Sequence, residues 1–535
     1  MATAAEAIAP IGKNEERRVI FASSLGTVFE WYDFYLYATL APFFAALFFP
    51  PGNATAALLS AFVAYAAGFL VRPFGALVFG RIGDLVGRKY TFLLTIVVMG
   101  SSTALVGLLP TYAKIGFAAP ILLVSLRLLQ GLALGGEYGG AATYVAEHAP
   151  HGKRGYNTSW IQTTATLGLL LALIVIGACR VKMTPDSFKE WGWRIPFLIS
   201  VILLVFSVYI RLKLQESPIF RAMKAQGKGS KAPLTDSFAR WSNLKIVLLA
   251  LLGATAGQGV VWYTGQFYAL FFLTLYLKLD YLTTYKLIGL SLIIGTPFFI
   301  FFGWLSDKIG RKWIIMAGCL IAALTYFPLF RGLTHNVNPA LEAYAAKTPV
   351  SVAASDCTMH IFPTPKTKFS DCDKARDFLT KNGLSFQELP AVSGETVVTK
   401  IGDAELHGWN EDKYKAVLKA SGYPDKLDPA GVNWGMTILI LVIMVIYVTM
   451  VYGPIAAFLV ELFPTRIRYT SMSLPYHIGN GWFGGMLPLL ATAMVASKGH
   501  IYAGLWYPII VALISFVIGS LFIRETKDRD IQHDF

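Results

Sequence analysis

Long apolar segments alternate with short polar ones along most of this chain. Most of the apolar segments reach the 18 or more residues with which a helix crosses roughly 30 Å of hydrocarbon. Because a segment in lipid must satisfy its own backbone polar groups, the pattern predicts membrane-spanning helices. We expect twelve of them, near residues 19–48, 56–80, 91–110, 118–142, 158–179, 194–213, 244–275, 283–305, 312–330, 434–460, 470–495 and 503–523.

Two longer polar segments interrupt this pattern. The first, 214–243, is basic and contains glycines, which predicts a cytoplasmic linker. The second, 331–433, predicts a small α/β unit with a strand at 350–354 and helices at 372–382 and 410–420, for which we expect a structural or gating role. The remaining domains are then a six-helix N-terminal half at 1–213, a C-terminal half at 244–330 and 434–523, and a cytoplasmic tail at 524–535.

Composition supports the membrane assignment. Hydrophobic residues make up 55% of the chain and charged residues only 15%. The net charge of +14 resembles that of a nucleic-acid-binding protein, but Lys and Arg concentrate in alternate loops and at both ends of the chain. Positive residues mark the cytoplasmic side, so we expect both termini in the cytoplasm, 331–433 outside, and no nucleic-acid partner. No cleavable signal peptide is evident, because the first apolar run is too long and carries Glu30 and Asp33.

The chain has four cysteines, and their positions differ in kind. Cys179 and Cys319 fall in apolar runs. Cys357 and Cys372 fall in the segment expected outside, where a disulfide between them would persist.

A charged phrase, Gly-x-x-x-Asp-x-x-Gly-Arg-Lys, begins at Gly80 and again at Gly303, each time between two apolar runs. A repeated hairpin of this kind indicates a duplicated membrane bundle, and such bundles usually move solutes. Glycine permits the tight turn, and the Asp can face a helix N-terminus or a nearby Arg. The phrase therefore predicts a latch that breaks when the two halves move, although a simple basic anchor is the alternative. The latch residues would be Gly80, Asp84, Gly87, Arg88, Gly303, Asp307, Gly310 and Arg311.

This phrase resembles the motif of the major facilitator superfamily, except that Leu85 stands where a basic residue is usual. Further phrases resemble the metabolite:proton symporter family, which includes bacterial porters for shikimate, 2-oxoglutarate, citrate and proline or betaine. The resemblance implies an all-α membrane protein with a twelve-helix bundle in the bacterial inner membrane, driven by a proton gradient without a cofactor, and we expect a monomer. The phrases lie at 29–37, 72–75, 127–131, 135–137, 215–218, 461–466 and 524–527.

Ionisable residues inside the apolar runs are candidates for proton coupling. A charge at the bilayer centre costs about 2.5–3.5 kcal/mol, so a retained one usually faces a cavity or a partner. Glu30 and Asp33 share one helix face, and two neighbouring carboxylates in a low dielectric cannot both ionise cheaply. Arg127 needs a counter-charge, which Asp33 or Glu30 could supply, and Glu137 lies about three turns further on.

Several polar and aromatic positions are candidates for binding a substrate. A guanidinium is a natural bidentate clamp for a carboxylate, and Gln258, Trp262 and Gln266 recur at helical spacing, as on a pore wall. Packing of the aromatic stripe, a merely hydrogen-bonded histidine and a snorkelling Arg72 are the alternatives. The candidate set is Arg72, Arg127, Tyr37, Gln130, Gln162, Gln258, Trp262, Gln266, His477 and Asn480.

Other patterns do not point to chemistry. The glycines at Gly479, Gly481 and Gly484 match a dinucleotide fingerprint by letter but lie within an apolar run without a βαβ context. Glu147, His148 and His151 fit a polar loop better than a metal site, so we expect no metal. The sequence contains no phosphate-binding loop that would indicate coupling to ATP.

We therefore expect a proton-coupled uptake carrier rather than an enzyme. Its cargo should be a small polar metabolite, for which we favour a carboxylate. The other expected partners are protons and the lipid bilayer. A zwitterion porter for proline or betaine and a non-transporting receptor remain the alternatives.

Overall fold

The computed structural model describes the chain from residue 13 onward, except for residues 86–87, 137, 151, 213–231, 361–363, 365, 392–395, 465–466, 530 and 532–535. Within the helices, the side chains of 13–23, 80–92, 144, 148, 210–211 and 233 lie outside the described part as well.

The N-terminal half is a bundle of helices in which α1 packs against α8 and α2, and α4 packs against α10 and α6. Small residues let these helices approach closely: a Cβ on Gly131 of α6 would lie 1.7 Å from the backbone oxygen of Gly68 on α2. The elements of this half are α1 (Lys13–Phe48), α2 (Ala54–Leu70), α3 (Arg72–Leu85), α4 (Arg88–Leu108), α5 (Tyr112–Ile115), α6 (Ala118–Leu134), α7 (Tyr138–His148), α8 (Arg154–Lys182), α9 (Pro185–Ser187), η1 (Phe188–Gly192) and α10 (Arg194–Leu212).

The C-terminal half repeats this architecture, with α18 packed against α22 and α26. Several of its helices contain π-helical segments, a feature frequent at functional sites. Its elements are α12 (Pro233–Phe238), α13 (Trp241–Ala250), η2 (Leu251–Thr255), α14 (Ala256–Tyr263), η3 (Thr264–Tyr268), α15 (Ala269–Phe271), η4 (Phe272–Tyr276), α16 (Tyr281–Gly295), α17 (Pro297–Ile309), α18 (Arg311–Val337), α22 (Trp434–Tyr452), α23 (Ile455–Leu462), α24 (Arg468–His477), η6 (Ile478–Gly485), α25 (Leu487–Lys498), η7 (Ala503–Leu505) and α26 (Trp506–Phe522).

Each apolar run predicted from the sequence coincides with helix. Within the described residues, nine helical stretches are long and apolar enough to cross a membrane, and a tenth is counted if the pair Pro185–Gly192 and Arg194–Tyr209, bent by 49°, forms one span. A mostly helical, multi-pass bundle is therefore confirmed, whereas the count of twelve crossings stays a prediction.

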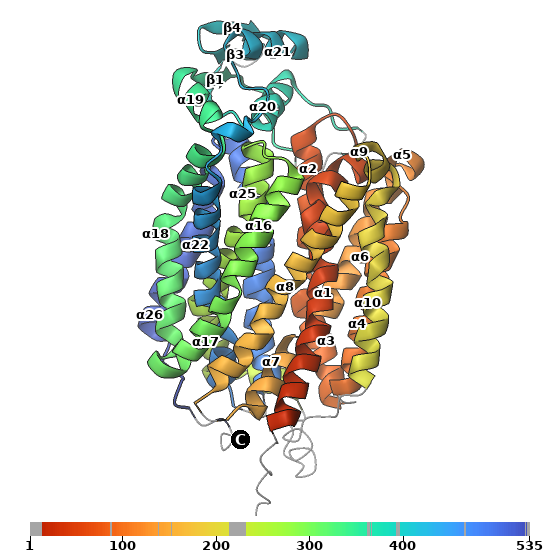
Figure 1. Ribbon diagram of the computed structural model, residues 1–535, viewed down its shortest axis with the longest axis vertical. Coiled ribbons are helices and arrows are strands. Elements are labelled where there is room, and N and C mark those ends of the chain that lie inside the picture. Colours follow the sequence, from red (N-terminus) through yellow and green to blue (C-terminus); the bar gives the residue numbers. More distant parts are fainter. Residues whose placement is uncertain are drawn as a thin grey trace, which may run out of the picture.

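The two halves stand side by side, and the inserted domain lies at one end of the bundle (Figure 1). We call this the domain end. At the opposite end, Arg154, Arg311 and Arg468 contact Arg529, Glu525 and Ile531 near the C-terminus, and we call this the basic end. Between the halves, α8 packs against α16 and α17, α7 packs against α23, and α2 and α3 pack against α24, η6 and α25.

The inserted domain has a four-stranded sheet in the order β2-β1-β3-β4. Strands β1 and β2 are parallel, whereas β3 is antiparallel to both β1 and β4. Its small separate core includes Val352, Leu379 and Tyr414. The elements are α19 (Pro339–Lys347), β1 (Val350–Ala353), α20 (Asp371–Lys381), β2 (Gln387–Leu389), β3 (Val398–Ile401), β4 (Ala404–His407), α21 (Glu411–Ala420) and η5 (Pro429–Gly431).

The predicted strand at 350–354 and the predicted helices at 372–382 and 410–420 match β1, α20 and α21 within a residue. The expected boundary at 330 differs, because α18 continues to Val337 and the domain starts near residue 339. Most of the predicted linker at 214–243 lies outside the described residues, and α12 and α13 form its described part.

Candidate functional site

Two arginines lie fully buried in the bundle, where α2, α3 and α6 meet α1. Arg72 begins α3 and Arg127 belongs to α6, and both side chains are 0% exposed. Phe34 of α1 contacts both, because its ring centroid lies 4.2 Å from the guanidinium carbon of Arg72 and 4.4 Å from that of Arg127. The separation of the two guanidinium groups therefore cannot exceed the sum of these distances. Two positive charges therefore share one small buried region.

Polar and aromatic side chains hold the Arg127 guanidinium in place. Its Nη1 donates to Gln130 Oε1 at 2.5 Å, and Gln130 Nε2 donates to Thr103 Oγ1 on α4 at 2.7 Å. The rings of Tyr37 and Tyr65 lie 4.7 and 5.4 Å from the guanidinium carbon, which favours a cation. The Nε and Nη2 groups of Arg127 have no acceptor in the part of the chain that the structure describes.

Arg72 has a similar environment on the neighbouring helix. Its guanidinium carbon lies 4.1 Å from the Phe69 ring centroid and 5.7 Å from that of Trp31. Its Nε and Nη2 groups also lack an acceptor among the described residues. Arg72, Glu30, Tyr476 and His477 line one small cavity between the halves.

No described carboxylate lies within ion-pairing distance of Arg72 or Arg127, so the sequence-based pairing of Arg127 with Asp33 or Glu30 is absent from this structure. The reason is the direction in which each acid points. Asp33 accepts a hydrogen bond from Ser200 of α10. Glu30 lines the cavity with Arg72 instead. Although they share a helix face, the two carboxylates therefore have different neighbours. Glu137 lies outside the described residues.

An aromatic and amide cluster joins the two halves close to the arginines. Tyr138 of α7 stacks on Tyr476 of α24, with ring centroids 3.4 Å apart. Gln162 of α8 donates from Nε2 to Tyr138 Oη at 2.8 Å and to the backbone oxygen of Tyr452 at 3.1 Å. The Tyr452 and Tyr476 hydroxyls are 2.8 Å apart. Breaking these contacts is necessary before the halves can separate here.

The predicted stripe on the seventh apolar run divides among three neighbours. Gln258 and Asn480 exchange two hydrogen bonds, at 2.9 and 2.8 Å, within the C-terminal half. Trp262 stacks on Tyr35 of the N-terminal half, with centroids 5.5 Å apart. Gln266 donates to Thr166 of α8 at 3.4 Å. The π-helical segment η3 begins between Trp262 and Gln266, so the regular spacing assumed for an α-helix does not hold.

The second copy of the repeated phrase closes the basic end. Both carboxylate oxygens of Asp307 accept from the first backbone N–H groups of α8, at 2.9 Å from Gly155 N and 2.8 Å from Tyr156 N. Arg311 holds the same carboxylate at 2.8 Å. Gly310 takes a φ of 109°, which lets the chain turn from α17 into α18. Gly303 lets α17 approach α8 closely, because a Cβ there would lie 2.6 Å from the backbone oxygen of Gly155.

Further buried ion pairs cross between the halves at the basic end. Glu461 of α23 pairs with Arg154 of α8 across the interface at 3.4 Å, and with Arg311 of its own half at 3.1 Å. Arg468 of α24 pairs with Glu147 of α7 at 3.2 Å. For the first copy of the phrase, Gly87 and the side chains of Asp84 and Arg88 lie outside the described residues, and Gly80 is placed only as backbone within α3.

These ion pairs are not predictable from the sequence. Glu147 fits a polar loop, and Glu461 and Arg468 lie within or beside a family phrase that does not indicate their partners. Nor do Phe34, Phe69 and Tyr65 stand out, because an aromatic residue in an apolar run gives no signal of its own.

At the domain end, a cavity of about 670 Å³ opens between the halves, beneath the inserted domain. It is lined by Ala45 and Pro50 of the N-terminal half, Lys278 of the C-terminal half, and Asp377 and Lys381 of α20. Lys278 donates to the backbone oxygens of Leu275 and Lys381. Burial, with a smaller effect from Lys381, lowers the pKa of Lys278 to about 8.

Two helical halves that meet around buried polar groups are the architecture of many secondary transporters. Residues 19–240 match the model of the family described as sugar (and other) transporter. The chain is 37% identical over 325 residues to the shikimate transporter of Escherichia coli (strain K12), covering 59% of this chain and 72% of the relative. It is 36% identical over 534 residues to a putative proline/betaine transporter of Staphylococcus aureus (strain MSSA476), covering 99% and 93%.

Among solved structures, the proton:xylose symporter XylE aligns with a TM-score of 0.63 at 15% identity, covering 98% of both chains. The chain therefore belongs to the major facilitator superfamily, among its metabolite transporters. It is a transport protein and not an enzyme.

Proposed function

We propose that this protein takes up a small organic carboxylate together with protons, by alternating access between the two halves. The observation that carries the proposal is the pair Arg72 and Arg127. Each guanidinium keeps two buried N–H groups without an acceptor among the described residues. Because an unpaired buried charge is costly, and a guanidinium matches a carboxylate in a bidentate way, a carboxylate substrate is the partner that this region fits best.

The positions of the cavity and of the ionic contacts support this assignment. The basic end is closed by Asp307 and Glu461, while the domain end has the 670 Å³ cavity. A substrate entering at the domain end would meet Lys278 first and then the aromatic layer of Tyr35 and Trp262. Reaching the arginines requires that layer to part, which is the movement that alternating access provides.

Asp33 is our candidate for the proton carrier, and Glu30 and Glu137 are further candidates for proton coupling. Asp33 is 5% exposed, and its described partner is the neutral Ser200. An ionised carboxylate in such an environment is unfavourable, so binding and release of a proton there would accompany a change of solvent access. The energy source in this proposal is the proton gradient, with no cofactor.

We infer twelve crossings, because α1 and α4 join the nine spans and the bent pair. Helix α1 runs for 36 residues and α4 for 21. The concentration of Lys and Arg at the basic end supports a cytoplasmic location for that end, with the inserted domain outside. One relative is named an inner membrane metabolite transport protein of Escherichia coli, which supports the same membrane here. We propose a monomer, since a single chain supplies both halves of the site.

A zwitterion such as betaine or proline is the second candidate. The stacked rings of Trp31, Tyr35 and Trp262 lie next to the arginines, and aromatic faces bind quaternary ammonium groups well. In that case the arginines would bind the carboxylate and the rings the ammonium group.

The test is uptake into proteoliposomes under an imposed pH gradient, inside alkaline. A radiolabelled dicarboxylate should accumulate and be displaced by other organic acids but not by betaine. Displacement by betaine and proline alone would establish the second candidate. Absence of accumulation for every compound of both classes, in liposomes that contain folded protein, would contradict transport as proposed.

A further inference from the structure

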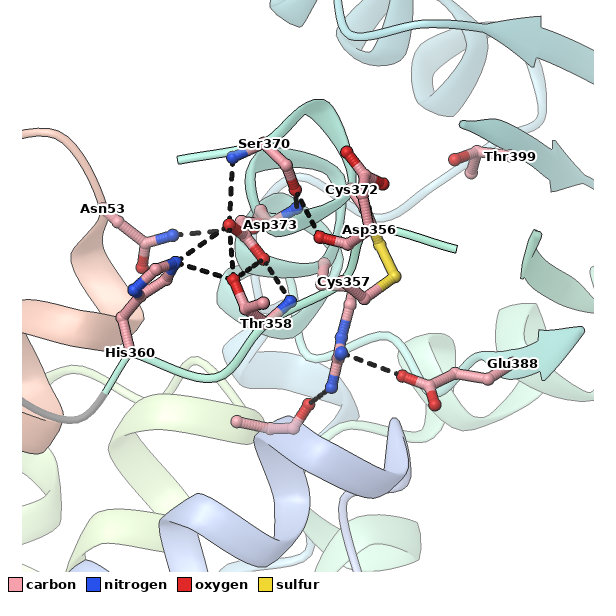
Figure 2. Close-up of a disulfide and its surroundings, with 12 residues drawn as sticks. Asn53, Asp356, Cys357, Thr358, His360, Ser370, Cys372, Asp373, Glu388 and Thr399 are labelled. Carbon is pink, nitrogen blue, oxygen red and sulfur yellow. Dashed lines mark hydrogen bonds and ion pairs between the residues drawn. A yellow bond between two sulfur atoms is a disulfide. The ribbon is translucent and has the colours of Figure 1, made fainter. Parts of the chain in front are cut away.

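The inserted domain contains a feature that transport does not explain. Strand β1 leads through α20 to the parallel strand β2, and the antiparallel pair β3-β4 then leads to α21. Here Cys357 follows β1 by four residues and Cys372 is the second residue of α20, and the two form a disulfide (Figure 2). The expected bridge between them is therefore present.

The two sulfurs differ in exposure and in setting. Cys372 is buried, whereas Cys357 is partly exposed, so an incoming thiol reaches the Cys357 sulfur more easily. The N-terminus of a helix favours a thiolate, and Cys372 lies in the first turn of α20. Fifteen positions separate the cysteines, so the loop between them is longer than in a Cys-x-x-Cys motif.

The loop that carries Cys357 is tied to the same turn of α20 by hydrogen bonds. Thr358 N donates to Asp373 Oδ1 at 2.8 Å, and His360 Nε2 lies 3.0 Å from Asp373 Oδ2 (Figure 2). Burial opposes ionisation of Asp373, but hydrogen bonds from the Thr358 and Ser370 amides and from His360 outweigh it and lower its pKa. The disulfide and this carboxylate together fix the start of α20.

Helix α20 also bridges the two halves of the transporter. One turn beyond the cysteine, Asp377 accepts hydrogen bonds from Thr55 N at 2.6 Å and Ala54 N at 3.2 Å, the first backbone amides of α2. Asn53 Nδ2 approaches the backbone oxygen of Asp373 at 3.5 Å. These contacts join the inserted domain to the N-terminal half.

The remainder of the domain is anchored to the C-terminal half, from which it is inserted. Arg376 Nη2 donates to the backbone oxygen of Ala496 at 2.6 Å, and Phe386 N donates to the backbone oxygen of Gly499 at 2.6 Å. Helix α20 therefore contacts both halves, through Asp377 on the N-terminal half and Arg376 on the C-terminal half. It spans the opening of the 670 Å³ cavity. Any motion that widens this opening must break the contacts of the domain with one half, either those between Asp377 and α2 or those with Ala496 and Gly499.

We propose that the inserted domain is a thiol–disulfide exchange site whose substrate is a dithiol, and that reduction of Cys357–Cys372 loosens the bridge between α20 and α2. A thiolate of the dithiol attacks the Cys357 sulfur, and the electron pair of the disulfide leaves on Cys372, which takes a proton from water. The second thiolate of the dithiol then attacks the dithiol sulfur that is bonded to Cys357, and Cys357 leaves and takes up a proton. Two electrons and two protons pass to the protein, and the dithiol becomes a disulfide.

The backbone amides of Ala54 and Thr55 report on this bridge directly. The first four N–H groups of a helix have no partner within the helix, so Asp377 is what protects these two. After reduction they should exchange with solvent about 10-fold to 100-fold faster, the effect of losing one hydrogen bond to a charged group. The amides of Gly155 and Tyr156, held by Asp307 at the other end, are the matched control and should not change.

The experiment treats the purified full-length protein with dithiothreitol under native conditions. Maleimide labelling counts the thiols, and hydrogen exchange follows the α2 and α8 amides. Asp377→Ala should give fast exchange at α2 with the disulfide intact, and the double variant Cys357→Ser and Cys372→Ser should do so without reductant. A disulfide that resists dithiothreitol until the protein unfolds would overturn the proposal, and so would reduction without faster exchange at Ala54 and Thr55.

The effect on transport rests on the proposed function. If α20 restrains the domain end, reduction should raise the initial rate of substrate exchange in proteoliposomes, and the double cysteine variant should no longer respond to dithiothreitol. An unchanged rate in protein with proven reduction and loosened α2 amides would remove the link to transport. The thiol and amide readouts need no substrate, so they test the redox site even where uptake is not observed.

Discussion

The latch at the basic end permits a quantitative prediction for Asp307→Asn. The aspartate accepts two backbone amides across the interface between the halves, at 2.9 and 2.8 Å, and is 3% exposed. Asparagine keeps one acceptor oxygen and loses the charge. A hydrogen bond to a charged group is worth about 1.5–3 kcal/mol, and a charge at a helix N-terminus about 0.3–1 kcal/mol. The closed basic end should therefore lose about 2–4 kcal/mol.

At about 1.4 kcal/mol per factor of ten, this loss raises the population with an open basic end by roughly 30-fold to several hundred-fold. The assay is maleimide labelling of Thr143→Cys, a buried position on α7 that contacts Met472 of the other half, with Cys179 and Cys319 replaced. In the matched control, Asp236→Asn, the substitution weakens an ion pair with the surface residue Arg240, so labelling should change less than about threefold. A labelling rate in Asp307→Asn no higher than in this control would refute the latch.

Three further outcomes are expected. Asp33→Asn should abolish accumulation against a gradient while exchange of substrate at equal pH survives; retained accumulation would remove Asp33 from proton coupling. Because Lys278 has a pKa of about 8, it loses its charge as the pH rises through that value, so the KM for an anion should increase between about pH 7 and 9 and stay flat in Lys278→Arg. Gly131→Val should lower the thermal unfolding temperature by overpacking against Gly68, about 1–3 kcal/mol of stability, whereas Gly435→Ala should not, because its Cβ would meet only Asn433 Oδ1, at 3.9 Å.

The large-scale fold was predictable because it depends on hydrophobicity and charge, which each residue of the sequence shows without knowledge of its neighbours in space. Apolar runs gave the helices, and the strand and helices of the inserted domain followed from its short apolar pattern. The details of the helices were less accessible. The π-helical segment at Thr264–Tyr268 changes which residues share a face, and no local pattern marked it.

The candidate site was predictable in its residue types and not in its pairings. The sequence located Arg72, Arg127 and Asp33 as costly charges in apolar runs. It could not show that Asp33 points to Ser200, because that contact depends on how α1 and α10 pack over 167 residues of separation. For the same reason, the partners of Arg468 and Glu461 at the basic end became visible only when the halves were assembled.

The central claim is that Arg72 and Arg127 together receive a carboxylate, and equilibrium binding tests it most directly. Titration calorimetry on purified protein should show a carboxylate that binds the unmodified chain and binds Arg127→Gln and Arg72→Gln at least about 10-fold to 100-fold more weakly, since each loses charge-assisted hydrogen bonds. Arg180→Gln, which removes an arginine packed on Phe188 and Tyr281 away from the site, should bind as the unmodified chain does. Equal affinity in all four proteins would contradict the account.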